Sequence, residues 1–124
     1  MNPLRFHLKA GAPIYEQVLY AARKAIVGGD FRAGEAFPSV RVLAEAYGIN
    51  PNTVQKAVNA LKAEGLIEIH PGVGTKVCAL PKAAREDKTQ LLNGGLEVLV
   101  LRAKQLRLTQ QEVIAALREH WETL

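Results

Sequence analysis

Two short helical patterns separated by three residues constrain this fold more than any other feature of the sequence. The first pattern follows Ser39 and the second follows Asn50. Both side chains are common N-caps, and Pro51 suits the first helical position, where an N–H has no helical partner. The intervening Gly48-Ile49-Asn50 has the length found between the helices of a helix-turn-helix. We therefore expect that motif at about residues 40–59.

The flanking patterns extend this motif. An apolar face of 3.6-residue period predicts a helix over about 13–27, followed by a loop over 30–35 that contains a turn glycine. Gly65 has the position of a left-handed residue that ends the second helix of the motif. Beyond it, two alternating stretches around Pro71-Gly72-Val73-Gly74 predict a β-hairpin at about 66–79. A hairpin in that place is the wing of a winged helix.

The amino-acid composition of the chain changes near Leu80-Pro81, after which two further helices are predicted. The first spans about 82–106, with leucines in a coiled-coil-like seam, and Asn93-Gly94-Gly95 interrupts it as a kink or a close helix contact. The second begins at a capping box, Thr109 with Glu112. The fold class is thus mainly α with a small β-hairpin: a winged helix-turn-helix over 1–80 and a two-helix segment over 81–124.

Charge and composition narrow the function. The formal net charge is +4 with a pI near 9.4, which admits a polyanion as partner without requiring one. Residues 1–80 carry 9 basic and 6 acidic side chains, and residues 81–124 carry 7 and 6. No apolar stretch reaches the roughly 18 residues of a membrane span, and the N-terminus lacks the apolar region of a secretory signal. We expect a cytoplasmic protein without membrane contact.

An enzyme is the first alternative, and the sequence does not favour it. Cys78 is the one cysteine, so an internal disulfide framework and a cysteine-based zinc cage are excluded within one chain. His7, His70 and His120 are scattered, and neither phosphate-binding nor dinucleotide-binding glycine motifs occur. We predict no catalytic residue, no metal and no cofactor, and a structural role for Cys78.

The second helix of the motif offers side chains suited to reading DNA. Asn and Gln amides can bond adenine in the major groove, and Thr can bond a base or contact the thymine methyl. A helix N-terminus binds phosphate, and a wing-tip glycine allows close approach to a minor groove. The DNA-binding candidates are Ser39, Arg41, Asn50, Asn52, Thr53, Gln55, Lys56, Gly72 and Lys76.

Each of these residues also has a simpler interpretation. Asn50 alone is more often only an N-cap, Gln55 and Lys56 on an exposed helix face are usually only solvated, and Gly72 is often only a turn residue. Their joint occurrence at the positions that a winged helix directs toward DNA favours the functional interpretation for the group.

The same stretches resemble the N-terminal domain of the GntR family of bacterial transcription regulators. The matching segments are PIYEQV at 13–18, AGEAFPSVRVLA at 33–44, YGINPNTVQKA at 47–57, EGLI at 64–67 and GVGTKV at 72–77. The wording INPNTV resembles the YtrA-like subfamily, which has a short two-helix C-terminal segment in place of a large effector domain. Many family members carry an arginine where this chain has Pro51, so that base contact is absent here, and an arginine is likewise replaced at Gln55.

The resemblance implies a homodimer that binds an imperfectly palindromic double-stranded operator, usually as a repressor. It implies DNA contacts for Arg41, Asn52, Thr53, Gln55 and Gly72, and target genes that often include ABC transporters. The C-terminal segment would dimerise, since two helices so apolar need a partner. The residues expected at the dimer contact are Leu92, Leu96, Leu99, Leu106, Leu117 and Trp121.

A second alternative remains at this point. A winged helix can act through protein contacts, or bind DNA as an architectural factor. The low net charge of +4 disfavours the architectural version, because sequence-independent coating of DNA depends on phosphate neutralisation. The sequence of the C-terminal segment has no convergent polar cluster, so it does not identify a small-molecule effector.

Overall fold

The computed structural model describes residues 1–124, which divide into two compact units. The first unit is Met1–Pro81 and the second is Lys82–Leu124. The first unit holds three helices and a two-stranded sheet, and the second holds two helical stretches. The two units differ in burial: the first has a hydrophobic core, and the second buries almost no side chain.

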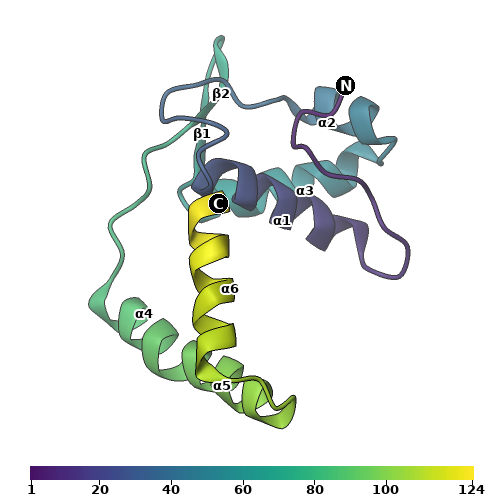
Figure 1. Cartoon of the computed structure of the whole chain (residues 1–124). Helices are drawn as coiled ribbons and strands as arrows, with labels where there is room; N and C mark the ends of the chain where they lie inside the picture. The colour runs from purple at the N-terminus through teal and green to yellow at the C-terminus, as the bar shows by residue number, and fades with distance from the viewer. The chain divides into compact units, whose positions relative to one another are not determined.

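Three helices enclose the core of the first unit (Figure 1). They are α1 (Ile14–Val27), α2 (Val40–Tyr47) and α3 (Pro51–Ala63), with α3 packed against both others. Apolar side chains at helical spacing supply the contacts. The largest fully buried side chains are Leu43, Leu61, Ile67, Val18 and Val54. The predicted mainly α fold with a small β-hairpin is confirmed.

The ends of α2 and α3 follow the capping signals of the sequence. The Ser39 hydroxyl accepts a hydrogen bond from the Val42 N–H at 3.2 Å. Gly48 ends α2 in the left-handed conformation, with φ at 62°. Gly65, predicted as a left-handed residue, has φ at 77° just beyond α3. Glycine suits both places because a Cβ disfavours positive φ.

The predicted hairpin forms. A third segment, which the sequence does not predict, pairs with it. Strands β1 (Ile67–His70) and β2 (Gly74–Val77) pair antiparallel, with Ile67 opposite Val77. The segment after the predicted loop pairs with the other edge of β2: the Phe37 N–H donates to the Thr75 carbonyl at 2.9 Å. The Gly34 N–H donates to the Val77 carbonyl at 2.8 Å. Residues 30–35 form the predicted loop, and the bridge comes just after it, at Ala36 opposite Lys76. This pairing is too short for its alternation to be recognised in the sequence.

The N-terminal residues are tied to the end of α2. The Tyr47 hydroxyl accepts from the Leu4 N–H at 2.8 Å and donates to Asn2 Oδ1 at 2.5 Å. The rings of Phe6 and Tyr47 lie 4.5 Å apart between centroids. Leu4 joins the hydrophobic core. The residues before α1 therefore hold the C-terminal end of α2 in place.

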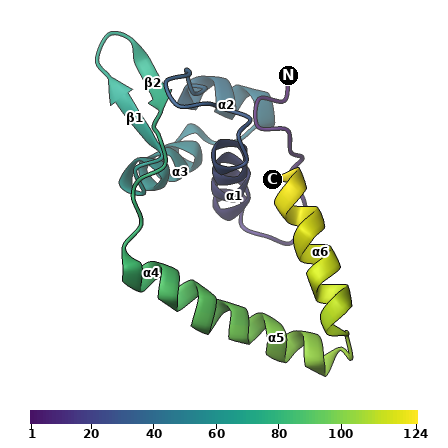
Figure 2. The ribbon, with the colours of Figure 1, turned by 60° about the vertical axis from the view of Figure 1, so that its left-hand side comes forward.

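The first helical stretch of the second unit is continuous but irregular (Figure 2). It comprises α4 (Arg85–Gln90), the π-helical turn η1 (Leu91–Gly95) and α5 (Leu96–Gln105). The stretch was expected from residue 82. It begins at Arg85 because Glu86 and Asp87 in its first turn suit the positive end of the helix dipole.

The glycine interruption is accommodated by the π turn. The Leu96 N–H bonds the Leu91 carbonyl, five residues back, which inserts one extra residue into the turn. A Cβ on Gly95 would lie 3.2 Å from Leu91 Cδ1, whereas one on Gly94 would meet open space. The helix therefore continues through these glycines instead of ending there.

A short turn leads into α6 (Gln110–Thr123), whose predicted capping box is present. The Glu112 N–H donates to the Thr109 hydroxyl, and the Thr109 N–H donates to the Glu112 carboxylate. Arg107, in the turn, has a positive φ of 59°. No residue of α6 is buried. Neither this helix nor any other in the structure is long and apolar enough to cross a membrane.

Candidate nucleic-acid interface

The turn between α2 and α3 fixes the two helices of the motif against each other. Ile49 lies in this turn with its side chain in the core, and its N–H donates to the Ala44 carbonyl at 3.0 Å. Gly48 beside it supplies the left-handed backbone. A buried anchor in so short a turn leaves little freedom in the direction of α3, which positions every side chain on that helix.

The outward face of α3 is polar and open. Val54 is completely buried, at 0% exposure, and with Ala57, Val58 and Leu61 it forms the inward stripe. The opposite side carries the exposed amides of Asn52 and Gln55 and the exposed ammonium of Lys56. Thr53 is half-buried, so it is less accessible than these three residues. The helix thus presents donors and acceptors without a competing apolar surface.

The side-chain oxygen of Asn50 caps α3. Its Oδ1 accepts a hydrogen bond from the Asn52 N–H at 2.8 Å, which caps α3 as the sequence predicted. Its amide nitrogen makes no bond in the structure. The capping role is therefore observed, whereas the predicted DNA contact of Asn50 stays a prediction.

Gln55 is held by a residue that the sequence analysis did not single out. The Gln55 Nε2 donates to Asn59 Oδ1 at 2.9 Å, one helical turn along. The i, i+4 spacing of two amides was the signal that could have found this pair. Both side chains are exposed on α3.

The start of α2 presents Ser39 and Arg41. The hydroxyl of Ser39 is engaged by the Val42 N–H, which leaves the earlier N–H groups of the helix open to an anion. Arg41 Nε lies 3.4 Å from Glu45 Oε1, one turn along α2, and both side chains are largely exposed. An ion pair so exposed contributes little, so Arg41 can exchange Glu45 for a phosphate or a base edge.

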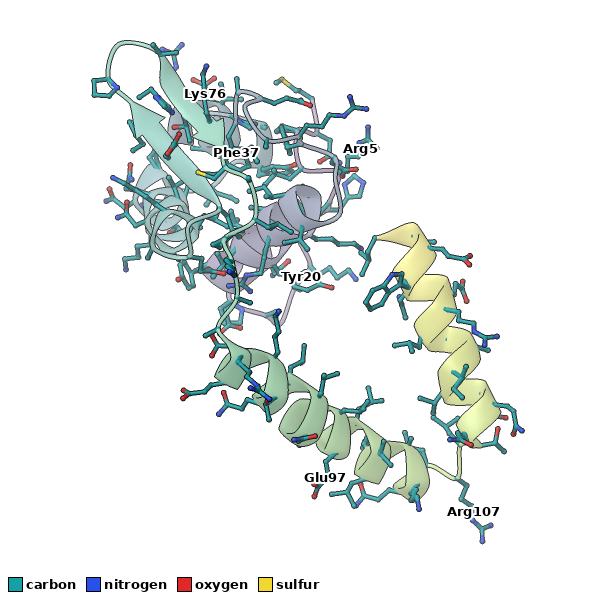
Figure 3. The ribbon with its side chains drawn as sticks, turned by 90° about the vertical axis from the view of Figure 1, so that its left-hand side faces the viewer. Arg5, Tyr20, Phe37, Lys76, Glu97 and Arg107 are labelled. Atoms are coloured by element: carbon teal, nitrogen blue, oxygen red, sulfur yellow. The ribbon has the colours of Figure 1, made fainter.

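The wing carries Gly72 and Lys76, and Figure 3 labels the second of these. Gly72 is exposed at the tip with φ at 77°, and a Cβ there would meet nothing within 4 Å. Lys76 lies on β2 directly opposite Glu68 on β1. The carboxylate of Glu68 bonds His70 Nε2 at 2.7 Å, and Lys76 makes no ion pair. The ammonium is therefore available to a phosphate.

One ion pair ties the far end of α3 to α1. Arg23 Nε and Nη2 donate to the two carboxylate oxygens of Glu64 at 2.9 and 3.0 Å. The hydrogen bond that Arg23 donates to Glu64 raises the pKa of the Arg23 guanidinium, more than the charge of the carboxylate does. This bidentate geometry joins the C-terminal end of α3 to the first helix. It supports the orientation of α3 without touching its outward face.

The cysteine is in a poor setting for chemistry. Cys78 follows β2, and its N–H donates to the Leu66 carbonyl at 2.9 Å. Burial raises the pKa of the thiol, and the neighbouring Glu68 raises it further by charge and hydrogen bonding. A reactive cysteine needs the opposite shift. The structure also contains no group of three or more His, Cys, Asp or Glu side chains that could hold a metal ion.

The residues predicted for dimerisation all lie in the second unit with their side chains open. Leu92, Leu96, Leu99, Leu106, Leu117 and Trp121 are between 47% and 81% exposed. Ala103 is the one buried apolar residue of that unit. Within a single chain, then, these leucines and the tryptophan have no core to fill.

Known proteins are similar to this chain in sequence and in fold. A model of the bacterial regulatory proteins of the gntR family matches residues 14–77. The transcriptional repressor YtrA of Bacillus subtilis is 36% identical over 98 residues, which cover 79% of this chain and 71% of that protein.

Solved structures agree with these matches. A transcriptional antiterminator from Listeria monocytogenes superposes with a TM-score of 0.78 at 28% identity, covering 93% of this chain and 88% of its own. The DNA-binding domain of AraR, in complex with the operator ORR3, superposes with a TM-score of 0.51 at 27% identity, covering 59% and 93%.

The matched residues include α1, α2, α3 and the hairpin, which are the elements of the helix-turn-helix and its wing. The matching family consists of bacterial regulatory proteins, and YtrA is a transcriptional repressor. The chain belongs to the GntR family, in its YtrA-like branch, and is a transcriptional regulator with a winged-helix DNA-binding domain.

Proposed function

We propose that this chain is a homodimeric repressor of its own operon. Residues 1–80 bind one half of an imperfectly palindromic double-stranded operator, and residues 81–124 hold two copies together. The observation that carries the DNA part is the row of exposed amides and an ammonium on α3, opposite a fully apolar inward stripe. Such a helix surface suits the major groove, where each base pair offers a distinct pattern of donors and acceptors.

The dimer part rests on the second unit. Leucines are exposed along α5, whereas α6 exposes Leu117 and Trp121, the latter at 81%. A single helix of 14 residues, the length of α6, is marginal in water without tertiary packing. A second copy of the same segment would cover these side chains, and helix association through leucine-rich seams is a common solution.

Dimerisation and operator symmetry support each other. One helix in the major groove reads only a few base pairs, so a second copy adds a second half-site about 34–36 Å away along the duplex. The predicted contacts from Ser39, Arg41 and Lys76 would fix each copy on the phosphates, while α3 supplies base contacts.

Relatives support the regulatory direction. YtrA of Bacillus subtilis is described as a repressor, and the AraR domain was solved on its operator. We extend these properties to this chain, with ABC transporter genes among the expected targets and the cytoplasm as the location. The DNA-bound state needs no cofactor.

A gel shift with the DNA upstream of the chain's own operon tests the proposal. The wild-type chain should retard this fragment, and unlabelled unrelated DNA should compete poorly. Arg41→Ala and Asn52→Ala should each weaken the specific complex. Arg118→Ala and Gln111→Ala remove a similar charge and amide from exposed positions of α6 and serve as matched controls.

The alternatives predict different gels. An architectural DNA binder would be displaced equally by every competitor, and a winged helix used for protein contacts would retard no fragment. Either result would overturn the repressor. Loss of binding in the two control variants would show that the assay reports general damage and not the proposed contacts.

A further inference from the structure

The outward face of α3 continues beyond the residues predicted to contact DNA. An α-helix advances about 100° per residue, so two residues seven apart lie within about 20° of the same direction. Asn59 is seven residues after Asn52 and is exposed, as Asn52 is. It lies nearly opposite the buried Val54, Ala57, Val58 and Leu61. By this geometry Asn59 is as central on the open face as Asn52.

Asn59 also controls the neighbouring amide. Its Oδ1 accepts from Gln55 Nε2 at 2.9 Å. A glutamine amide has two N–H donors and one acceptor oxygen. The bond to Asn59 uses one N–H and leaves the other, together with Oε1. A donor beside an acceptor is the combination that adenine recognises in the major groove.

Asn59 itself keeps unused hydrogen-bonding groups. Its amide oxygen is engaged, and its NH₂ group makes no bond in the structure. Two free donors suit an acceptor edge, either guanine O6 and N7 or thymine O4. The pair therefore presents an ordered sequence of groups along the helix: a donor and an acceptor on Gln55, then donors on Asn59.

We propose that Asn59 is a specificity-determining residue of this winged helix. Its oxygen orients the Gln55 amide, and its NH₂ group bonds a guanine or thymine next to the base pair that Gln55 contacts. The inference rests on the proposed binding of α3 in the major groove. Readout extends one helical turn beyond Lys56, to a base pair that the other candidates do not reach.

Operator variants with single base-pair changes test this. An operator is first selected from random duplex DNA by the wild-type full-length chain. Dissociation constants are then measured for every single base-pair variant with wild-type, Gln55→Ala, Asn59→Ala, Asn59→Asp and the double alanine variant. Gln111→Ala, which removes an exposed amide from α6, is the control. Thermal unfolding verifies that all variants fold.

The substitutions separate the two roles of Asn59. Asn59→Ala should reduce discrimination by about tenfold at two adjacent base pairs, its own and that of Gln55. Asn59→Asp keeps an acceptor for Gln55 but has no donor. It should lose discrimination only at its own base pair, with a uniform fall in affinity from the added negative charge. The double variant should lose less than the sum of the two single effects.

Two results would overturn the inference in distinguishable ways. If wild-type and Asn59→Ala chains discriminate equally at every base pair, Asn59 is only a solvated helix residue, and the repressor proposal survives. If the wild-type chain selects no preferred sequence, the proposed function fails and the role of Asn59 fails with it.

Discussion

Replacing Asn50 separates a capping role from a base-reading role at the start of α3. The structure engages Asn50 Oδ1 with the Asn52 N–H at 2.8 Å, at an exposed helix end. Removal of such a cap costs about 1 kcal/mol. For the 81 residues of the first unit this corresponds to a fall in melting temperature of about 4–8 °C. In urea unfolding followed by circular dichroism at a fixed chain concentration, Asn50→Ala should lower the free energy of unfolding by about 1 kcal/mol.

Two further substitutions at the same position complete the experiment. Asn50→Ser and Asn50→Asp retain a capping oxygen, so their stability should lie within about 0.5 kcal/mol of the wild type. Base preference on single-base-pair operator variants should be unchanged in the serine variant. If Asn50→Ala is as stable as the wild type while Asn50→Ser loses preference at one base pair, the cap reasoning is refuted and Asn50 reads DNA.

Other contacts give similarly direct expectations. Lys76→Ala should lower the slope of log affinity against log salt by about 1, in titrations with specific and unrelated DNA alike, if its ammonium meets a phosphate. Tyr47→Phe leaves the Leu4 N–H without its partner and should cost about 1 kcal/mol in urea unfolding, a loss absent if solvent replaces the hydroxyl. Because burial and Glu68 raise the pKa of Cys78, less of it is thiolate at pH 8 than in free cysteine, and alkylation should be slower and should accelerate at higher pH. Equal rates would contradict that environment.

Local signals in the sequence predicted the ends of the helices well, in both units. Ser39 and Asn50 cap their helices, Gly48 and Gly65 take left-handed conformations, and the capping box at Thr109 forms. These features depend on residues within one or two turns of each other. Short-range patterns therefore specify them almost completely.

Long-range contacts escaped prediction for a physical reason. The bonds from Tyr47 to Leu4 and Asn2 join residues more than forty positions apart, and no periodicity marks them. The pairing of residues 34–37 with β2 involves too few residues to alternate visibly.

The candidate interface was also predicted only in part. Residue types and helix position predicted which side chains of α3 are exposed, but not which bonds they make. The i, i+4 spacing places Gln55 beside Asn59 and Arg41 beside Glu45, but the bonds themselves depend on side-chain rotamers that spacing alone does not specify. The π turn at the glycines is a similar case, since the sequence showed an interruption without its geometry.

The mass of the chain in solution tests the central claim of a dimeric operator binder most directly. Light scattering should give twice the 13.5 kDa chain mass for the wild type, and the mass of one chain for the variant carrying both Leu96→Glu and Leu99→Glu. Both leucines are exposed on α5, so the variant has no core packing of its own chain to lose. A variant that keeps the full dimer mass would contradict dimerisation through this segment, and a monomeric wild type would contradict the dimer itself.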